Sequence, residues 1–176
     1  MIDLERSLTG PEQQRVAAAR AKVHALYAGT RTPHRSCGIA MAETFGMPTA
    51  SYQALRRGGL TGRGPCGVAL GGRLVLGEIL GDPDPAGPPT ARLLAAVEAY
   101  DRALHGRMGR PEADSLVCDD LTRPFPAFRS PERHAFCTGL ATEVGTLVAE
   151  ILVRAGWDGE ITPIPGLGPE GRLTGA

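Results

Sequence analysis

Residues 130–156 read SPERHAFCTGLATEVGTLVAEILVRAG, and this stretch decides the fold. Ser130 can cap a helix, Pro131 suits its first turn, and Glu132 places a negative charge at its positive end. Gly156 marks the end of the pattern. In between, apolar residues recur at helical spacing along one face: Cys137, Leu140, Val144, Leu147, Val148 and Ile151. The sequence therefore predicts a long amphipathic helix that carries Cys137 on its buried face.

Helical patterns recur through the rest of the chain. They predict helices over residues 11–27, 36–45, about 49–57, 66–80 and 90–108, and an irregular loop with one helical turn between 112 and 129. Segment 66–80 is apolar nearly all round, which indicates a buried central helix, although a buried strand also fits. Its four internal glycines suggest that neighbouring backbone or a cofactor approaches closely. We predict an all-α, single-domain helical bundle of about five to six helices.

Length and composition limit the classes of function that fit the chain. The chain has 176 residues, enough for one domain with its own core, which we place at 1–156, followed by a Pro/Gly-rich tail at 157–176. The formal net charge is zero, so no overall field recruits nucleic acid or an anionic membrane. The first residues lack the pattern of a signal peptide, and no uninterrupted apolar run approaches membrane-spanning length. We expect a cytoplasmic protein that binds no nucleic acid and does not insert into a membrane.

Four cysteines are the best clue to function: Cys37, Cys66, Cys118 and Cys137. In a reducing cytoplasm, such thiols are more often metal ligands or redox groups than permanent disulfides. Cys37 and Cys66 are predicted at helix N-termini, where backbone N–H groups and the helix dipole favour the thiolate, and Cys118 is predicted in a loop beside Asp119. The absence of any C-x-x-C weakens a thioredoxin-type dithiol and a zinc ribbon. The simplest competing interpretation is four small buried hydrophobic side chains.

The order and context of these cysteines resemble the C_GCAxxG_C_C family of redox-active four-cysteine proteins. The resemblance rests on Cys37 at a helix start, Cys66-Gly67-Val68-Ala69-Leu70-Gly71 after a glycine-rich loop, Cys118-Asp119-Asp120-Leu121, and Cys137 on the last helix. It covers about residues 31–155, with Val68 in place of the motif's alanine. The family is similar to the cysteine-bearing part of split-Soret cytochromes, so the resemblance implies that these cysteines hold iron and sulfide. It does not imply c-type haem, because the chain has no C-x-x-C-H.

Two mechanisms suit four gathered cysteines. An iron–sulfur cluster for electron transfer or sensing would be ligated by all four thiolates, while Gly67 and Gly71 let backbone N–H groups reach its sulfurs. A cofactor-free thiol–disulfide protein would instead use Cys37 and Cys66 as its reactive pair. A structural zinc site, or a non-catalytic helical interaction module with inert thiols, forms a third class. We expect the chain to exchange electrons with a redox partner protein, and both a monomer and a homodimer are compatible with its sequence.

Histidines near the cysteines carry a smaller hypothesis. His34 and His134 each lie three residues before a cysteine and could act as ligands or proton partners. The simpler interpretation, which we favour, is a surface histidine near a helix start in both cases.

Other charged residues and loops are interpreted conservatively. Arg35, Arg63 and Arg133 could offset thiolate charge, but a solvated surface is the expected place for arginine in an arginine-rich chain. Asp119 and Asp120 are expected to cap a helix or to face solvent. The glycine-rich loop 58–65 lacks the G-K-[ST] ending of a phosphate-binding loop, and the chain has no G-x-S-x-G elbow.

Overall fold

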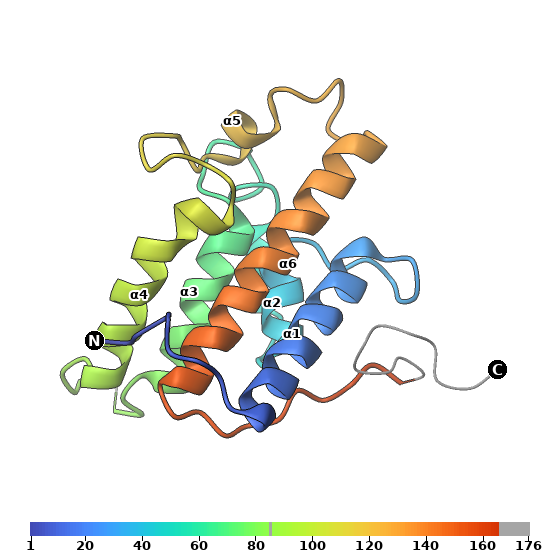
Figure 1. The fold of residues 1–176 in the computed structure, drawn as a ribbon. Coiled ribbons are helices and arrows are strands. Elements are labelled where there is room, and N and C mark those ends of the chain that lie inside the picture. The colour runs from blue at the N-terminus through green and yellow to red at the C-terminus, as the bar shows by residue number, and fades with distance from the viewer. Residues whose placement is uncertain (85, 166–176) are drawn as a thin grey trace.

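A computed structural model describes residues 1–84 and 86–165 of the chain. Within these residues the protein forms six α-helices and one 3₁₀-helix, and no strand (Figure 1). The helices are α1 (Gly10–Ala28), α2 (Gly38–Thr44), α3 (Gly67–Leu80), α4 (Ala91–Arg107), α5 (Cys118–Thr122) and α6 (Pro131–Arg154), and the 3₁₀-helix η1 spans Ser51–Leu55. The predicted all-α bundle is confirmed, and segment 66–80 forms a helix rather than the competing strand.

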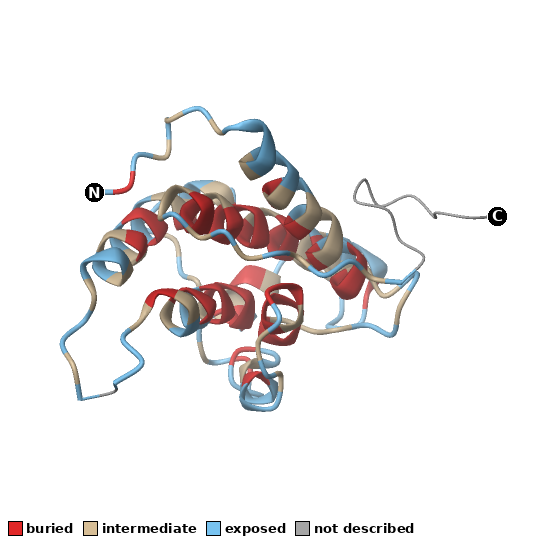
Figure 2. Cartoon of the chain, turned by 90° about the horizontal axis from the view of Figure 1, so that it is seen from below, coloured by how far each residue is buried: buried red, intermediate tan, exposed pale blue. Residues whose placement is uncertain are grey.

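Helix α6 is the centre of the bundle. It packs against α1, α2, α3 and α4, and Figure 2 shows that the buried residues gather where the helices face one another. The side chain of Ser130 accepts a hydrogen bond from the backbone N–H of Arg133 at 3.2 Å, and Pro131 occupies the first turn, as the sequence predicts. By length and composition α6 could also cross a membrane, although Glu143 and Glu150 interrupt its apolar run. In the bundle 72% of that apolar window is buried, so core packing accounts for its apolar character.

Helix α1 lies along α6 and ends beside the candidate site. It begins with a capping box, in which Thr9 accepts from the N–H of Glu12 and the Glu12 carboxylate accepts from the N–H of Thr9 at 2.8 Å. It ends at Gly29, whose φ of 68° is the left-handed conformation that glycine adopts without strain. This sharp end places Tyr27, which is only 2% exposed, in the interior next to the cysteines.

Glycines let α2 and α3 cross with their backbones in contact. A Cβ atom on Gly71 would lie 2.7 Å from the Cα atom of Gly38, and one on Gly38 would lie 3.0 Å from the carbonyl oxygen of Gly67. Side chains larger than hydrogen do not fit between the two helices at these positions. Since Cys37 precedes α2 and Cys66 precedes α3, the crossing brings both cysteines to the same end of the bundle.

The glycine-rich loop 58–65 holds the start of α5. The N–H of Cys66 donates to the carbonyl of Leu116 at 2.7 Å, and the N–H of Cys118 donates to the carbonyl of Gly64 at 3.0 Å. Gly58 has φ of 54°, and a Cβ atom there would lie 2.6 Å from the Cβ atom of Cys118. These contacts fix Cys118 beside Cys66, although 52 residues separate them in the sequence.

The first part of the predicted tail packs on the bundle. The ring of Trp157 lies against that of Phe45 with centroids 6.2 Å apart, and Ile161 and Ile164 pack against the core. The remainder of the predicted tail, residues 166–176, lies outside the described residues.

Candidate functional site

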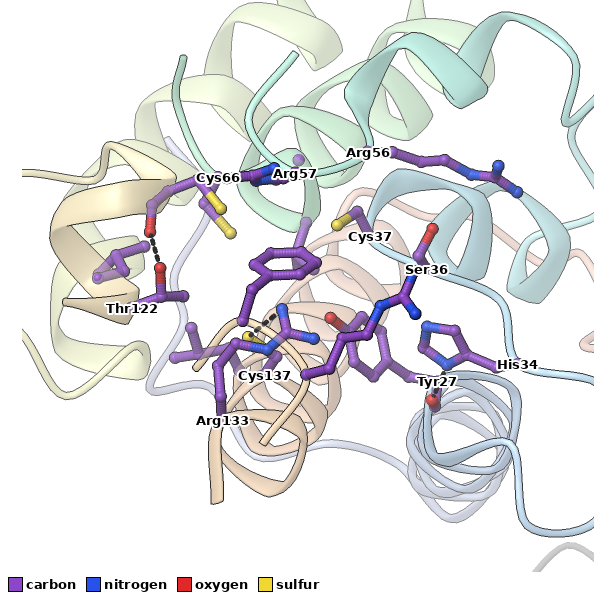
Figure 3. A pocket seen from close by; sticks show the side chains of 17 residues that line it. Tyr27, His34, Ser36, Cys37, Arg56, Arg57, Cys66, Thr122, Arg133 and Cys137 are labelled. Atoms are coloured by element: carbon purple, nitrogen blue, oxygen red, sulfur yellow. Dashed lines mark hydrogen bonds between the residues drawn. The ribbon is translucent and has the colours of Figure 1, made fainter. Parts of the chain in front are cut away.

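All four cysteines line one cavity at the end of the bundle where α2, α3 and α5 begin (Figure 3). The cavity has a volume of about 480 Å³, within the range of small-molecule sites. The four thiols are free, with no disulfide between them. The complete lining is Tyr27, His34, Ser36, Cys37, Arg56, Arg57, Cys66, Gly67, Val68, Cys118, Leu121, Thr122, Phe128, Arg129, Arg133, Cys137 and Leu140. The convergence of the cysteines that the sequence predicts is therefore observed, whereas binding of a cofactor stays a prediction.

Cys37 is held in a strained backbone conformation. Its φ is 51° and its ψ is −128°, in a region that side-chain-bearing residues rarely adopt. Its sulfur accepts a hydrogen bond from the backbone N–H of Arg57, which also has a positive φ of 47°. Strain of this kind costs of order 1–3 kcal/mol per residue and is concentrated at functional sites in proteins. Both strained residues line the cavity. Their position is therefore typical of a functional site.

Cys66 and Cys118 are the most buried of the four. Cys66 is the N-cap residue of α3; its side chain makes no capping hydrogen bond, although the nearby backbone N–H groups of Ala69 and Val68 act to lower its pKa. Cys118 is the first residue of α5 rather than a loop residue, so the single helical turn predicted in this region begins at the cysteine itself. Both residues are less than a tenth exposed.

Cys137 lies in the second turn of α6 and is half-buried. The Tyr27 hydroxyl acts to lower the pKa values of both Cys137 and Cys37, since it can donate a hydrogen bond to one sulfur or the other. Nη1 of Arg133, one turn earlier, lies 3.9 Å from the Cys137 sulfur, as the dashed line in Figure 3 shows. Cys137, which the sequence places on the buried face of its helix, is less buried than Cys66, against which the segment around Leu116 packs.

Burial raises the pKa of every thiol in the cavity. It raises the pKa of Cys66 to about 12 and that of Cys118 to about 11, and it also raises the pKa values of Cys37 and Cys137. The N–H groups of Ala69 and Val68 oppose this effect at Cys66 but are outweighed. The expectation of lowered pKa values at Cys37 and Cys66 is therefore wrong, because desolvation of a thiolate exceeds the stabilisation offered by the helix start.

The formally charged side chains that line the cavity, apart from the titratable thiols and His34, are all cationic. Arg56, Arg57, Arg129 and Arg133 line it, and no aspartate or glutamate does. None of these four arginines forms an ion pair with a described residue, and Nε of Arg133 is buried with no hydrogen-bond partner there. The Phe128 ring lies between two of them, 4.7 Å from the guanidinium carbon of Arg57 and 4.0 Å from that of Arg133.

Nearby acidic residues have other partners. The carboxylate of Asp119 packs against Gly62, where an added Cβ atom would overlap it, and its N–H donates to the Gly62 carbonyl at 2.9 Å. Asp120 pairs with Arg123, outside the cavity. The two acids that follow Cys118 in the sequence therefore do not neutralise the arginines of the cavity.

The other two arginines singled out from the sequence have separate places. Arg35 pairs with Glu43 at 2.5 Å, and Arg63 does not line the cavity. Of the three, only Arg133 is placed to interact with a cysteine sulfur.

The two histidines lie side by side, with ring centroids 5.3 Å apart. His34 is exposed at the cavity edge and its Nδ1 donates to the carbonyl of Tyr27, while Nε2 of His134 lies 3.0 Å from the carbonyl of Ala28. Partial burial, together with the charges of His134, Arg133 and Arg56, lowers the pKa of His34. Among the residues described, no three Cys, His, Asp or Glu side chains are placed to hold a single metal ion.

The two glycines predicted to face a cofactor differ in position. Gly67 lines the cavity, and a Cβ atom on it would lie 1.9 Å from the carbonyl oxygen of Leu55 and 3.0 Å from the Cβ atom of Cys37. Gly71 does not line the cavity and is explained by its contact with Gly38 in the α2–α3 crossing.

Several residues of the site were not singled out from the sequence. Tyr27 is visible there only as one member of an apolar stripe, and Arg56 and Arg57 only as the end of a short helix. Phe128 and Arg129 belong to a segment without periodicity, which carries no signal of its own in a single sequence.

Comparisons with known proteins add no identification. The resemblance of the cysteine pattern to a redox-active family stays an expectation, and the functional argument rests on the cavity itself. No protein-family model matches the chain, and no curated protein or solved structure is significantly similar to it.

Proposed function

We propose that the protein binds an iron–sulfur cluster through Cys37, Cys66, Cys118 and Cys137 and uses it for electron transfer or sensing. The single observation that carries this proposal is that four thiols from four separate segments line one partly enclosed cavity. When bound, such a cluster supplies one-electron chemistry, while the chain supplies the ligands, the hydrogen bonds and the exclusion of water.

The donor set suits a cluster. Thiolate sulfur is the usual ligand of iron–sulfur centres, and its softness also favours such centres over hard cations. The cavity of about 480 Å³ has room for a group of several atoms, whereas a single zinc ion needs four sulfurs drawn in to about 2.3 Å. The arrangement of the thiols around a cavity thus supports a polynuclear group.

The surroundings of the sulfurs also support thiolate ligation. The backbone N–H groups of Arg57, Val68 and Ala69 and the hydroxyl of Tyr27 act to lower the pKa values of nearby thiols and so favour their thiolates. Donors of this kind stabilise negative charge on ligating sulfur and tune the reduction potential. Arg133 adds a positive charge beside Cys137. The raised thiol pKa values mean that cluster assembly must release protons, so binding should strengthen as the pH rises.

The same pKa values count against disulfide exchange. An attacking cysteine needs a substantial thiolate fraction near neutral pH and access for a partner. Burial raises the pKa of both Cys37 and Cys66, the two candidates, and Cys66 is only 8% exposed.

The test is iron and acid-labile sulfide content across the four Cys→Ser variants after anaerobic reconstitution. Each variant should lose iron, Cys137→Ser as fully as Cys66→Ser, because a hydroxyl is a poor replacement for a soft thiolate ligand. The control is Thr122→Ser, which alters the cavity lining but keeps every thiol and should retain iron. If iron never binds, or all four serine variants keep it, the cluster is refuted and the thiol interpretation replaces it.

A further inference from the structure

The arginines of the cavity carry positive charge that no described group neutralises. Elsewhere in the protein arginines meet carboxylates, as Arg35 meets Glu43 and Arg107 meets Glu150. In the cavity four arginines face a lining without aspartate or glutamate. A set of guanidinium groups gathered at a concave site is the arrangement that proteins use to bind oxyanions, because each group can donate two parallel hydrogen bonds.

We infer that this cavity binds a small organic anion, with its phosphate or carboxylate group held by Arg56, Arg57 and Arg129 at the mouth. Ser36 and Thr122 provide hydroxyl donors in the same lining. Phe128 and Leu121 provide an apolar wall for the organic part of the ligand. A mixture of apolar walls and a few convergent polar groups is typical of small-molecule sites of this volume.

The positions of the arginines separate this role from simple charge compensation of thiolates. Arg133 is the arginine whose guanidinium lies at a cysteine sulfur, and of the other three charges only that of Arg56 also acts to lower the pKa of a thiol, that of Cys37. Arg56, Arg57 and Arg129 are exposed residues of two loops that meet across the opening. Their charges are therefore placed where a ligand would enter from solvent. This inference goes beyond the proposed cluster and does not require iron.

The test is calorimetric titration of reduced, metal-free protein with phenyl phosphate, benzoate and inorganic phosphate at constant ionic strength. We expect one binding site per chain. At least one of the two aromatic anions, phenyl phosphate or benzoate, should bind more tightly than inorganic phosphate. Benzyl alcohol, which keeps the ring and lacks the charge, should not bind. Phenyl phosphate and benzoate share the phenyl ring and differ in the charged group, so their order of affinity shows whether the arginines bind a phosphate ester or a carboxylate more tightly.

Substitutions locate the site. Arg57→Gln and Arg129→Gln should each weaken binding roughly tenfold, the usual effect of losing a charge-assisted contact, and Arg57→Lys should weaken it less. The control Arg92→Gln, at an exposed arginine of α4 outside the cavity, should leave affinity unchanged. Equal losses in the Arg92 variant, several weak sites, or no binding would overturn the inference.

Titration of iron-loaded protein provides the second arm. Retained anion binding supports a ligand site beside the sulfurs, whereas its loss on loading would show that the arginines serve only as counter-charge, and would overturn the inference. Iron content is measured independently of anion binding, so a failure of the cluster proposal is distinguishable from a failure of this one. If no iron binds, the metal-free titrations alone decide.

Discussion

The crossing of α2 and α3 gives the sharpest test of how the fold positions the site. Replacing Gly71 by alanine places a methyl group 2.7 Å from the Cα atom of Gly38 and 3.3 Å from side-chain atoms of Met41. A backbone atom cannot rotate away, so the helices must separate. Overpacking of this kind costs about 1–3 kcal/mol, whereas alanine in place of a helical glycine gains up to about 1 kcal/mol.

Gly77 of the same helix provides a matched control. A Cβ atom there meets nothing within 4 Å, so Gly77→Ala receives the helix-propensity gain without the clash. The difference in unfolding free energy between the two alanine variants should therefore equal the cost of the clash, about 1–3 kcal/mol. Gly77→Ala should be more stable than the unchanged protein, and Gly71→Ala the less stable of the two variants.

Urea unfolding of reduced, metal-free protein, followed by circular dichroism, measures both variants. Gly71→Ala should also bind less iron after reconstitution, because separation of α2 from α3 moves Cys37 away from Cys66. If Gly71→Ala stabilises the protein as much as Gly77→Ala does, the close crossing is refuted, and with it the explanation of how these two cysteines meet.

Three further predictions concern the sulfurs. Cys37→Gly should be more stable than Cys37→Ala by about 1 kcal/mol in urea unfolding. Both variants lack the thiol, but only glycine adopts the positive φ of this position without strain. Equal stabilities of the two variants would show that the backbone at residue 37 is unstrained. The unfolding free energy of metal-free protein should fall as the pH rises above 9, since the folded state keeps the proton of Cys66, whose pKa is raised from 9.0 to about 12, while the unfolded chain loses it. The stabilisation from the protonated Cys66 thiol is fully present below pH 9, and above it the unfolding free energy falls by at most about 1.4 kcal/mol per pH unit for that thiol. Cys66→Ala should reduce this dependence of stability on pH. If the substitution leaves the pH dependence unchanged, the raised pKa of Cys66 is contradicted. Tyr27→Phe should make the midpoint potential of iron-loaded protein more negative in a redox titration, because a hydrogen-bond donor to ligating sulfur is lost. An unchanged potential would show that the Tyr27 hydroxyl does not interact with a ligating sulfur.

Much of the fold could be predicted because its signals are local. Thr9 with Glu12, Thr90, and Ser130 with Pro131 are caps that a sequence displays directly, and apolar periodicity supplies the rest of α1, α4 and α6. The glycines of α3 predicted a close neighbour, and the backbone of α2 is that neighbour at Gly71. The 3₁₀ geometry of η1, in which Tyr52 is the buried residue, has no comparable local signal in the sequence.

The site could be predicted only in part, because its physics is set by tertiary burial. Cysteine chemistry and order pointed to one joint site, and the four residues do line one cavity. The direction of the pKa shifts at Cys37 and Cys66 could not be obtained from helix starts, since the enclosing segments come from elsewhere in the chain. The grouping of the arginines around Phe128 could not be predicted, because they belong to segments distant in sequence that meet only in the folded protein.

The most direct test of the central claim is the iron X-ray absorption spectrum of anaerobically purified protein. Thiolate and sulfide ligation by the four cysteines predicts a first shell of sulfur alone and a second shell of iron neighbours, both lost in Cys66→Ser. A first shell of oxygen or nitrogen, or protein that is free of iron both as purified and after reconstitution, would contradict the account.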